Sequence, residues 1–387
     1  MRRPSQGLRI GVDATSLIGP RSGVGQTTAS IVEALVTLDE GVDITLFPIS
    51  LRRGGWVRHA VTPHSRISVA RSRMPGRVAA AVWSRVEWPP AELFCGPLDV
   101  FWGPNFVLPP LVKAAGVITV HDVAFVDVPE TCSEAVLRYT DTVPKMMQRA
   151  NRIIVPSRFS AERVSTWMPE EADRIRVVYP GVRRVFRERG GPLTPPRMDA
   201  LGIRALYAVY LGNLELRKNV DRLFKAFELV RTVHPDAQLV AIGSPSVGWD
   251  AIASRHAKLL ESDAVRVVGY LPDEEAAAIV RGARVFAYPS LYEGFGIPPL
   301  EAMAAGTPVV AAKTSSLPEA LGEHVRWVHP EDVDGIASAI GEHFDGEPDP
   351  STIEAARQWA AEFTWAASAA STLEVFADAI SEARDDA

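Results

Sequence analysis

The stretch VFAYPSLYEGFGIPPLEAMAAGTPVV, residues 285–310, changes character along its length in the order strand, turn, helix, strand. The apolar runs near Val285–Tyr288 and Pro308–Ala311 predict two strands, and Pro299–Ala305 predicts a helix between them. A crossover helix of this kind joins two parallel strands. This stretch therefore predicts an α/β fold built on a parallel sheet.

The turn between the first strand and the helix suits an anionic ligand. Open parallel sheets bind ligands at the carboxyl ends of their strands. The Gly294-Phe295-Gly296 turn lets backbone N–H groups approach a ligand closely. The helix start that follows favours anions through its N–H groups and its dipole. The turn therefore predicts a phosphate or diphosphate site.

Two carboxylates flank this turn. Glu293 precedes it, and Glu301 lies eight residues later in the predicted helix. Carboxylates accept hydrogen bonds from pairs of sugar hydroxyls, so the two side chains are suited to hold a sugar and a ribose at the two ends of a diphosphate. The alternative is a Glu293 that caps the helix and a Glu301 that is solvated.

A second element points to the same chemistry. The sequence GNLELRKN, residues 212–219, follows a predicted strand at Leu206–Leu211 and precedes a predicted helix. Arg217 and Lys218 would stand at the carboxyl end of that strand, where they can neutralise a diphosphate. By itself a basic pair before a helix is equally well explained by a surface role. Beside an independent anion site, it indicates a second part of that site.

Short apolar strands alternate with helical patterns along both halves of the chain, which predicts two sheets made of βαβ units. Further strands are predicted near residues 8–12, 43–47, 117–120, 153–155, 176–179, 238–242, 265–268 and 325–328. Further helices are predicted near residues 26–38, 133–149, 157–167, 219–233, 273–281, 333–344, 352–361 and 365–384.

The 387 residues are too many for one ordinary core, so two domains are expected. The segment YPGVRRVFRERGGPLTPP, residues 179–196, interrupts the alternation of strands and helices, and its Pro, Gly and Arg content is typical of a linker. We therefore expect a first Rossmann-like domain over residues 1–183, a linker over 184–200 and a second Rossmann-like domain over 201–364.

Composition excludes several classes of protein. The hydrophobic content of 47% and the charged content of 23% are typical of a soluble globular protein, and the net charge of −6 gives no argument for nucleic-acid binding. The start, MRRPSQG, lacks the apolar core of a signal peptide, and no apolar run is long enough to span a bilayer. Cys95 and Cys132 stand outside any metal-binding spacing and predict two ordinary thiols in a reducing cytosol.

The E-x7-E pattern of Glu293 and Glu301, together with GNLELRKN, resembles the donor-site motifs of the large retaining glycosyltransferase family 4, which has the GT-B fold. The resemblance covers nearly the whole chain and includes SGVG from Ser22, GPNFVLPP from Gly103, TVHDVAF from Thr119 and VPSRFSAERV from Val155. It implies two Rossmann-like domains whose parallel sheets face each other across a cleft. It also implies a hexosyltransferase that retains anomeric configuration, as in members that build bacterial polysaccharides and glycolipids.

The resemblance implies roles for residues of the second half. Glu293 would hold hydroxyls of the donor sugar and act in catalysis, and Glu301 would hold the ribose. The diphosphate would be held by backbone amides and two basic side chains, namely Gly294, Phe295, Gly296, Ile297, Arg217 and Lys218. The loop Gly269-Tyr270-Leu271-Pro272 would contact the base. Many relatives carry a basic residue at the position of Asn213, so the diphosphate would depend more on Lys218 here.

The resemblance also implies roles for the first half and for the end of the chain. His121 would reach the donor sugar as a catalytic residue, although a lone His after a strand is more often structural. Gly23 and Gly25 would let the first loop approach the donor phosphate and the acceptor. The last helix, over residues 365–387, would cross back to the first domain.

The identity of the substrates stays open in the sequence. The donor is expected to be a GDP-, UDP- or dTDP-linked sugar, with GDP-mannose as the first choice and mannosyl transfer as the first choice of reaction. The acceptor would be a glycan, a lipid-linked sugar or a small molecule. No cofactor and no catalytic metal are expected, because Asp332-Val333-Asp334 stands where a helix begins and is better explained as a cap than as a metal-binding DxD. The alternatives are a sugar-nucleotide epimerase or hydrolase and a non-catalytic sugar-nucleotide sensor.

The segment Arg52–Trp88 concentrates basic and aromatic residues in an otherwise acidic chain. Its members are Arg52, Arg53, Arg58, Arg66, Arg71, Arg73, Arg77 and Arg85, with Trp56, Trp83 and Trp88. Such a surface would attract anionic lipid headgroups, which implies a cytoplasmic protein with a peripheral contact at the inner face of the cell membrane. The alternative, a solvated face with ordinary packing tryptophans, is equally well supported.

Overall fold

The structure of the protein is a computed structural model that describes residues 7–19, 22–50, 54–70, 82–83, 86, 88–346 and 348–385. The chain divides into two compact units. The first comprises Met1–Val123, Arg138–Gly181 and Thr364–Ala387, and the second comprises Ala124–Leu137 and Val182–Phe363. The chain therefore passes from one unit to the other four times.

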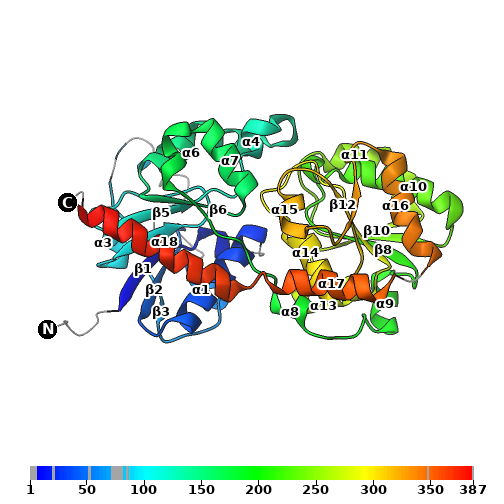
Figure 1. Cartoon of the computed structure of the whole chain (residues 1–387), viewed down its shortest axis with the longest axis horizontal. Coiled ribbons are helices and arrows are strands. Elements are labelled where there is room, and N and C mark those ends of the chain that lie inside the picture. The colour runs from blue at the N-terminus through cyan, green and yellow to red at the C-terminus, as the bar shows by residue number, and fades with distance from the viewer. Residues whose placement is uncertain are drawn as a thin grey trace. The chain divides into compact units, whose positions relative to one another are not determined.

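Over the described residues, the first unit is built on a parallel sheet of seven strands in the order β3-β2-β1-β4-β5-β6-β7 (Figure 1). The strands are β1 Leu8–Asp13, β2 Val42–Phe47, β3 Ile67–Val69, β4 Val100–Gly103, β5 Ala115–Thr119, β6 Arg152–Val155 and β7 Ile175–Val177. Strands β4 and β5 are buried along their whole length. A parallel sheet that is covered on both faces requires such continuous apolar strands.

The helices of the first unit that lie in the described residues are α1 Gly23–Leu38, α3 Glu92–Cys95, α6 Tyr139–Gln148, α7 Arg158–Trp167 and α18 Trp365–Asp385, with shorter turns η1 Thr15–Leu17, η2 Gly54–His59 and η4 Pro169–Arg174. Helix α18 packs beside α1 (Figure 1). Its Val375, Phe376 and Ala379 are buried, and the Phe376 ring lies 6.2 Å from the ring of Trp102 on β4. The end of the chain therefore supplies part of the core of the first unit.

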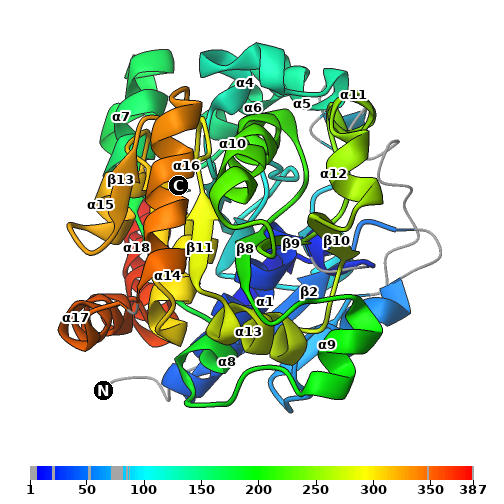
Figure 2. The same ribbon diagram turned by 90° about the vertical axis from the view of Figure 1, so that its right-hand side faces the viewer.

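The second unit contains, among its described residues, a parallel sheet of six strands in the order β10-β9-β8-β11-β12-β13 (Figure 2). The strands are β8 Tyr207–Leu211, β9 Gln238–Ile242, β10 Val265–Gly269, β11 Val285–Tyr288, β12 Val309–Ala312 and β13 Arg326–Val328. Strands β8, β9 and β11 are almost entirely buried. This is the arrangement predicted from residues 285–310.

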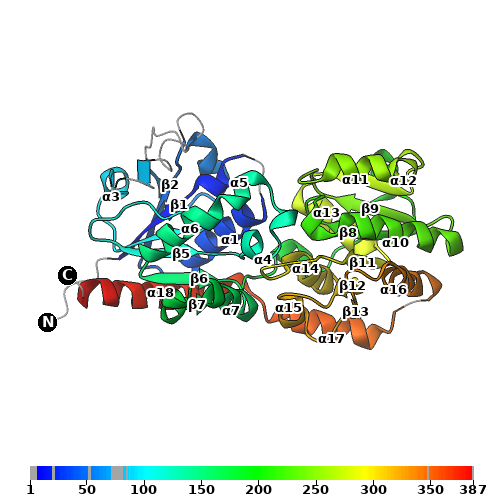
Figure 3. The same cartoon turned by 90° about the horizontal axis from the view of Figure 1, so that it is seen from above.

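The second unit contains the following helices among its described residues. They are α4 Ala124–Asp127, α5 Glu134–Leu137, α8 Arg184–Arg187, α9 Pro195–Leu201, α10 Val220–Val233, α11 Trp249–Arg255, α12 Ala257–Glu261, α13 Asp273–Gly282, α14 Ile297–Ala305, α15 Leu317–Leu321, α16 Val333–Asp345 and α17 Pro350–Ala361, with turns η3 Pro129–Thr131 and η5 Leu216–Lys218. Helices α10 and α16 lie side by side (Figure 3). Asp332 caps α16, because its carboxylate accepts a hydrogen bond of 2.9 Å from the Gly335 amide. The predicted cap is confirmed.

Each sheet has one point at which the strand order reverses. In the first unit β1 leads outward to β2 and β3, while β4 lies on its other side. In the second unit β8 leads outward to β9 and β10, while β11 lies on its other side. Loops that leave the carboxyl ends of strands on the two sides of such a switch point diverge and leave room for a ligand. The loops after β8 and β11 are the two that the sequence singled out.

The structure departs from the sequence-based expectations in several elements. Strands β3 and β4 were not expected from the sequence. The helix expected over residues 133–149 is interrupted at Arg138. Residues 124–137 belong to the second unit. Residues 184–200, expected as a linker, also belong to the second unit and form α8 and most of α9, because Phe186 is buried there.

Candidate donor site

The loop after β11, residues 289–296 and called here the β11 loop, turns sharply into α14. Gly296 has a φ of 110°, and a Cβ added to it would lie 2.5 Å from a side-chain carbon of Leu317, so only glycine fits. Ser316 fixes the same turn, because its hydroxyl donates to the carbonyl oxygens of Glu293 at 2.8 Å and Phe295 at 3.0 Å. These hydrogen bonds from Ser316, which lies outside the β11 loop, therefore hold the backbone of the turn in one conformation.

The start of α14 presents fewer backbone donors than an ordinary helix. Pro298 and Pro299 occupy its second and third positions and carry no N–H, so among the first three helical residues only Ile297 has one. The helix dipole still favours an anion at this end. An anion would therefore depend on the backbone amides of the turn and of Ile297.

The loop after β8, residues 212–219 and called here the β8 loop, brings its basic pair to Glu293. The Lys218 ammonium donates to both carboxylate oxygens of Glu293, at 2.7 and 2.8 Å, and to the Tyr288 hydroxyl at 2.9 Å. Arg217 donates to the Tyr292 carbonyl at 2.9 Å and reaches Glu293 at 3.5 Å. The structure therefore unites the two motifs that were recognised separately in the sequence.

Glu293 is buried and ionised in this arrangement. Burial alone would raise the pKa of its carboxyl group, but the charges of Lys218 and Arg217 outweigh that effect and lower the pKa below its ordinary value of 4.5. At neutral pH Glu293 is therefore a carboxylate that only accepts hydrogen bonds, as binding to sugar hydroxyls requires.

Asn219 joins the two loops. It is buried with a φ of 59°, and its side-chain amide donates to the carbonyl oxygens of Pro289 at 2.9 Å and Pro330 at 2.6 Å. The Leu291 amide also donates to the Arg217 carbonyl at 2.9 Å. These bonds fix the distance between the β8 and β11 loops, and therefore fix Lys218 against Glu293.

Glu301 lies inside α14 and is paired with Arg183, which the sequence placed at the end of the first domain, just before the expected linker. The Arg183 guanidinium grips both oxygens of Glu301, with Nε to Oε1 and Nη2 to Oε2 each at 2.6 Å, and its Nη1 donates to Asp273 at 2.7 Å. Burial opposes the charge of Arg183, but Glu301 and then Asp273 outweigh it and raise its pKa. No local pattern marks Arg183, which is one arginine among several in a Pro- and Gly-rich stretch.

The loop predicted to contact the base leads from β10 into α13. Its Tyr270 side chain is exposed, with 55% of its surface accessible, whereas Leu271 is buried. Asp273, the first residue of α13, belongs to the Arg183 cluster. The structure therefore brings this loop close to Glu301, with an aromatic ring available to solvent.

His121 follows β5 in the first unit. Its Nε2 donates to the Pro104 carbonyl at 2.8 Å, and burial lowers the pKa of the imidazole, so the ring is neutral with Nδ1 as the acceptor nitrogen. The ring lines a cavity of about 30 Å³ together with Trp102, Thr119 and Thr372. The role in catalysis predicted for His121 stays a prediction.

The two glycines of the first loop differ in what they do. Ser22 caps α1 and accepts a hydrogen bond of 3.2 Å from the Gly25 amide. A Cβ on Gly25 would lie 2.4 Å from the Ser16 carbonyl oxygen, whereas a Cβ on Gly23 would meet no atom within 4 Å. Gly25 is therefore needed by the protein's own backbone, and Gly23 is open to its surroundings.

The basic and aromatic segment Arg52–Trp88 is described only in part. Arg52, Arg53, Arg71, Arg73, Arg77 and Arg85 lie outside the described residues. Trp83 is buried and donates to the Pro89 carbonyl at 3.2 Å, so it is a packing residue. Trp56 and Trp88 are exposed. No helix within the described part of the chain has the length and apolar character needed to cross a bilayer.

Comparison with family models and with curated sequences finds proteins that this chain resembles. The family model described as "Glycosyl transferases group 1" matches residues 202–359, which include the β8 and β11 loops. The O-antigen chain mannosyltransferase B of Escherichia coli is 32% identical to this chain over 245 residues, which make up 62% of this chain and 64% of that protein. This chain thus spans less than two thirds of the length of that curated relative.

Solved structures resemble the whole chain. Sucrose-phosphate synthase from Thermosynechococcus elongatus superposes with a TM-score of 0.71 at 19% identity, covering 96% of this chain and 98% of that one. Alr3699/HepE of Anabaena, in complex with UDP and glucose, superposes with a TM-score of 0.66 at 16% identity, covering 95% of this chain and 99% of that one. The likeness establishes the fold, and the predicted pair of Rossmann-like domains of the GT-B type is confirmed.

Proposed function

We propose that this chain is a glycosyltransferase that moves a hexose from a nucleotide diphosphate sugar to an acceptor, with retention of anomeric configuration. One observation carries the proposal. At the switch point of the second sheet, a buried carboxylate, Glu293, is kept ionised by Lys218 and Arg217 beside a glycine turn that opens a helix. The family model that matches residues 202–359 supports the same class of reaction.

Each part of the donor would bind to the protein groups whose chemistry suits it. Hydroxyls of the sugar donate to Glu293, and hydroxyls of the ribose donate to Glu301. The diphosphate oxygens accept from the amides of Gly294, Phe295, Gly296 and Ile297 and from the two basic side chains. The base stacks on Tyr270 and packs against Leu271. Groups fixed before the reaction stabilise the charge that develops on the departing diphosphate without reorganising.

For the donor we propose GDP-mannose first. The E. coli relative is named for the transfer of mannose. The Anabaena structure holds UDP and glucose, which keeps a UDP-linked hexose as the second choice, and a dTDP-linked sugar is the third. The acceptor class is a glycan, a lipid-linked sugar or a small molecule.

The reaction we propose needs no covalent intermediate on the protein. The acceptor oxygen attacks the anomeric carbon on the face from which the diphosphate leaves, the bond to the diphosphate breaks, and the leaving phosphate takes the acceptor proton. His121 contributes a neutral imidazole to the sugar.

We also propose a cytoplasmic protein that touches the inner face of the membrane, which the exposed Trp56 and Trp88 support because exposed tryptophans favour a lipid–water interface.

A panel of nucleotide sugars tests the proposal. Purified protein is mixed with GDP-mannose, UDP-glucose and dTDP-linked sugars, and thermal stabilisation and slow release of nucleotide diphosphate are recorded. We expect one donor to stabilise the protein and to be turned over faster when an acceptor extract is present. Fast consumption without acceptor would indicate an epimerase or hydrolase, and binding without any turnover would indicate a sensor. NMR of the new glycosidic bond decides retention, and an inverted bond contradicts it.

A further inference from the structure

The Arg183 side chain covers the carboxylate of Glu301, to which the proposed function assigns the ribose. Only 1% of the Glu301 side chain and 17% of the Arg183 side chain are accessible to solvent. Each oxygen of Glu301 already accepts from a guanidinium nitrogen at 2.6 Å, and Oε1 also lies 3.4 Å from the Arg183 amide. A diol that approaches Glu301 therefore finds the carboxylate both covered and satisfied.

The guanidinium has a second anchor that does not depend on Glu301. Its Nη1 donates to Asp273 at 2.7 Å, and Asp273 keeps 27% of its side chain accessible. A guanidinium that leaves Glu301 can thus remain paired with Asp273 nearer to solvent. Deleting one partner of a buried ion pair leaves an uncompensated charge, whereas a guanidinium that releases Glu301 stays paired through its bond to Asp273.

We propose that Arg183 is a latch on the ribose position, so that a nucleotide binds through its ribose only after Arg183 has released Glu301 while it keeps its bond to Asp273. This inference rests on the proposed function, which assigns the ribose to Glu301. Arg183 is then a residue that sets nucleotide affinity without touching the reacting atoms. It makes the apparent affinity depend on the fraction of molecules whose latch is open.

The latch has a consequence that separates ribonucleotides from nucleotides without ribose hydroxyls. A 2′,3′-dideoxynucleoside diphosphate makes no hydrogen bond to Glu301, so it binds with the latch closed. A ribonucleoside diphosphate must open the latch. Weakening the Arg183–Glu301 pair should therefore tighten the binding of the second ligand and leave the first unchanged.

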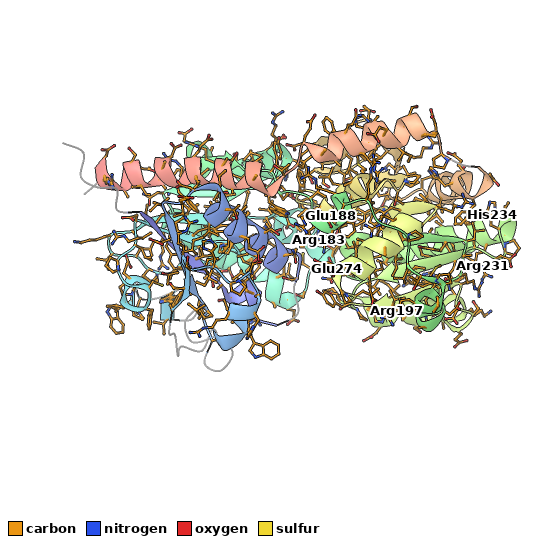
Figure 4. All side chains as sticks on the ribbon, turned by 90° about the horizontal axis from the view of Figure 1, so that it is seen from below. Arg183, Glu188, Arg197, Arg231, His234 and Glu274 are labelled. Atoms are coloured by element: carbon orange, nitrogen blue, oxygen red, sulfur yellow. The ribbon has the colours of Figure 1, made fainter. Side chains whose placement is uncertain are left out.

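Arg183→Lys is the variant of choice. Lysine keeps the positive charge but replaces the two-pronged bond to the carboxylate with a single point contact. Arg197→Lys is the matched control, because Arg197 on α9 grips Glu275 by a similar fork, at 3.2 and 2.9 Å, in the same unit but away from Arg183 (Figure 4). Thermal unfolding of each unliganded variant verifies that it is folded.

The experiment measures the binding of GDP and UDP, and of their 2′,3′-dideoxy analogues, to the full chain by calorimetry. In Arg183→Lys we expect the ribonucleotide to bind about three- to tenfold more tightly, with the dideoxy analogue unchanged. In Arg197→Lys neither affinity should change. In the wild type, the guanidinium NMR signal that Arg183→Lys removes should shift when the ribonucleotide is added.

The outcomes separate this inference from the proposed function. If the wild type binds none of these nucleotides, the proposed function fails. If the wild type binds the ribonucleotide but Arg183→Lys binds it equally well or more weakly, the latch is wrong and Arg183 instead holds Glu301 in its working position. A guanidinium signal that does not respond to the nucleotide also overturns the latch.

Discussion

Lys218 uses its hydrogen-bonding capacity fully in the absence of a ligand. An ammonium group has three N–H donors, and those of Lys218 face both oxygens of Glu293 and the hydroxyl of Tyr288. A diphosphate that binds to Lys218 must therefore share it with Glu293 or replace one of these partners. The charge of Glu293 and the affinity for diphosphate are thus coupled at the scale of single residues.

This coupling predicts the behaviour of Glu293→Gln. Transfer should fall by about 100-fold or more, because the amide cannot accept as the carboxylate does and the sugar is misplaced. Binding of the free nucleotide diphosphate should stay equal or become tighter, because Lys218 and Arg217 lose their carboxylate partner. Glu215→Gln, which removes only the 3.1 Å pair with Arg217, serves as the control. A parallel loss of transfer and nucleotide affinity would contradict the assignment of Glu293 to the sugar.

The ionisation of Glu293 predicts how stability depends on pH. Its pKa is lowered from 4.5 in the folded protein, so its contribution is present above that pH and is lost as the pH falls through the folded value. In Lys218→Met, burial dominates and raises the pKa of Glu293. The difference in Tm between wild type and Lys218→Met should therefore be largest at neutral pH. It should begin to shrink as the pH falls through the raised pKa of Glu293 in the variant, and continue to shrink through the lowered pKa of the wild type. Calorimetry over a pH series measures it, and a constant difference would refute the ion pair.

At the scale of elements, the first turn of α1 makes a close backbone contact that only glycine at position 25 tolerates. Gly25→Ala would push a Cβ to 2.4 Å from the Ser16 carbonyl oxygen, while Gly23→Ala enters open space. We expect Gly25→Ala to lower the free energy of unfolding by about 1–3 kcal/mol. Gly23→Ala should be neutral or stabilise the protein by up to about 1 kcal/mol. Denaturant titration of both variants checks this, and equal stabilities would show that the Ser16 contact relaxes without cost.

The sequence predicted those elements whose deciding residues follow one another closely along the chain. The β11 strand, its glycine turn and α14 follow one another within residues 285–305, so spacing and residue type sufficed to predict them. That the β8 and β11 loops belong to one site followed from the rule that ligands bind at carboxyl ends of parallel strands, whereas the direct bond of Lys218 to Glu293 was not predicted. Arg183 could not be predicted, because its pairing with Glu301 joins residues far apart in sequence. The role of Gly25 depends on a carbonyl oxygen of Ser16 that no spacing rule identifies.

At the scale of the whole molecule, the residues assigned to the donor and to catalysis are divided between the two units. The β8 loop, the β11 loop and Glu301 belong to the second unit, and His121 belongs to the first. His121→Ala should therefore keep the affinity for nucleotide diphosphate within about twofold and lose most transfer. His64→Ala is the control, because the exposed His64 lies in the first unit and its Nδ1 accepts a hydrogen bond from the nearby Arg66 amide. Normal transfer by His121→Ala would remove His121 from the mechanism.

Helix α18 links the order of synthesis to the order of folding. Its buried Phe376 and Ala379 complete a core that begins with Ile10 on β1 and includes Leu35 on α1. The ribosome makes residues 182–363 of the second unit before it reaches this helix. At about 5–20 residues per second, that interval is roughly 10–40 s. During that interval the part of α1 that packs against α18 lacks this partner. The first unit therefore completes its core after the second unit, although its synthesis starts earlier.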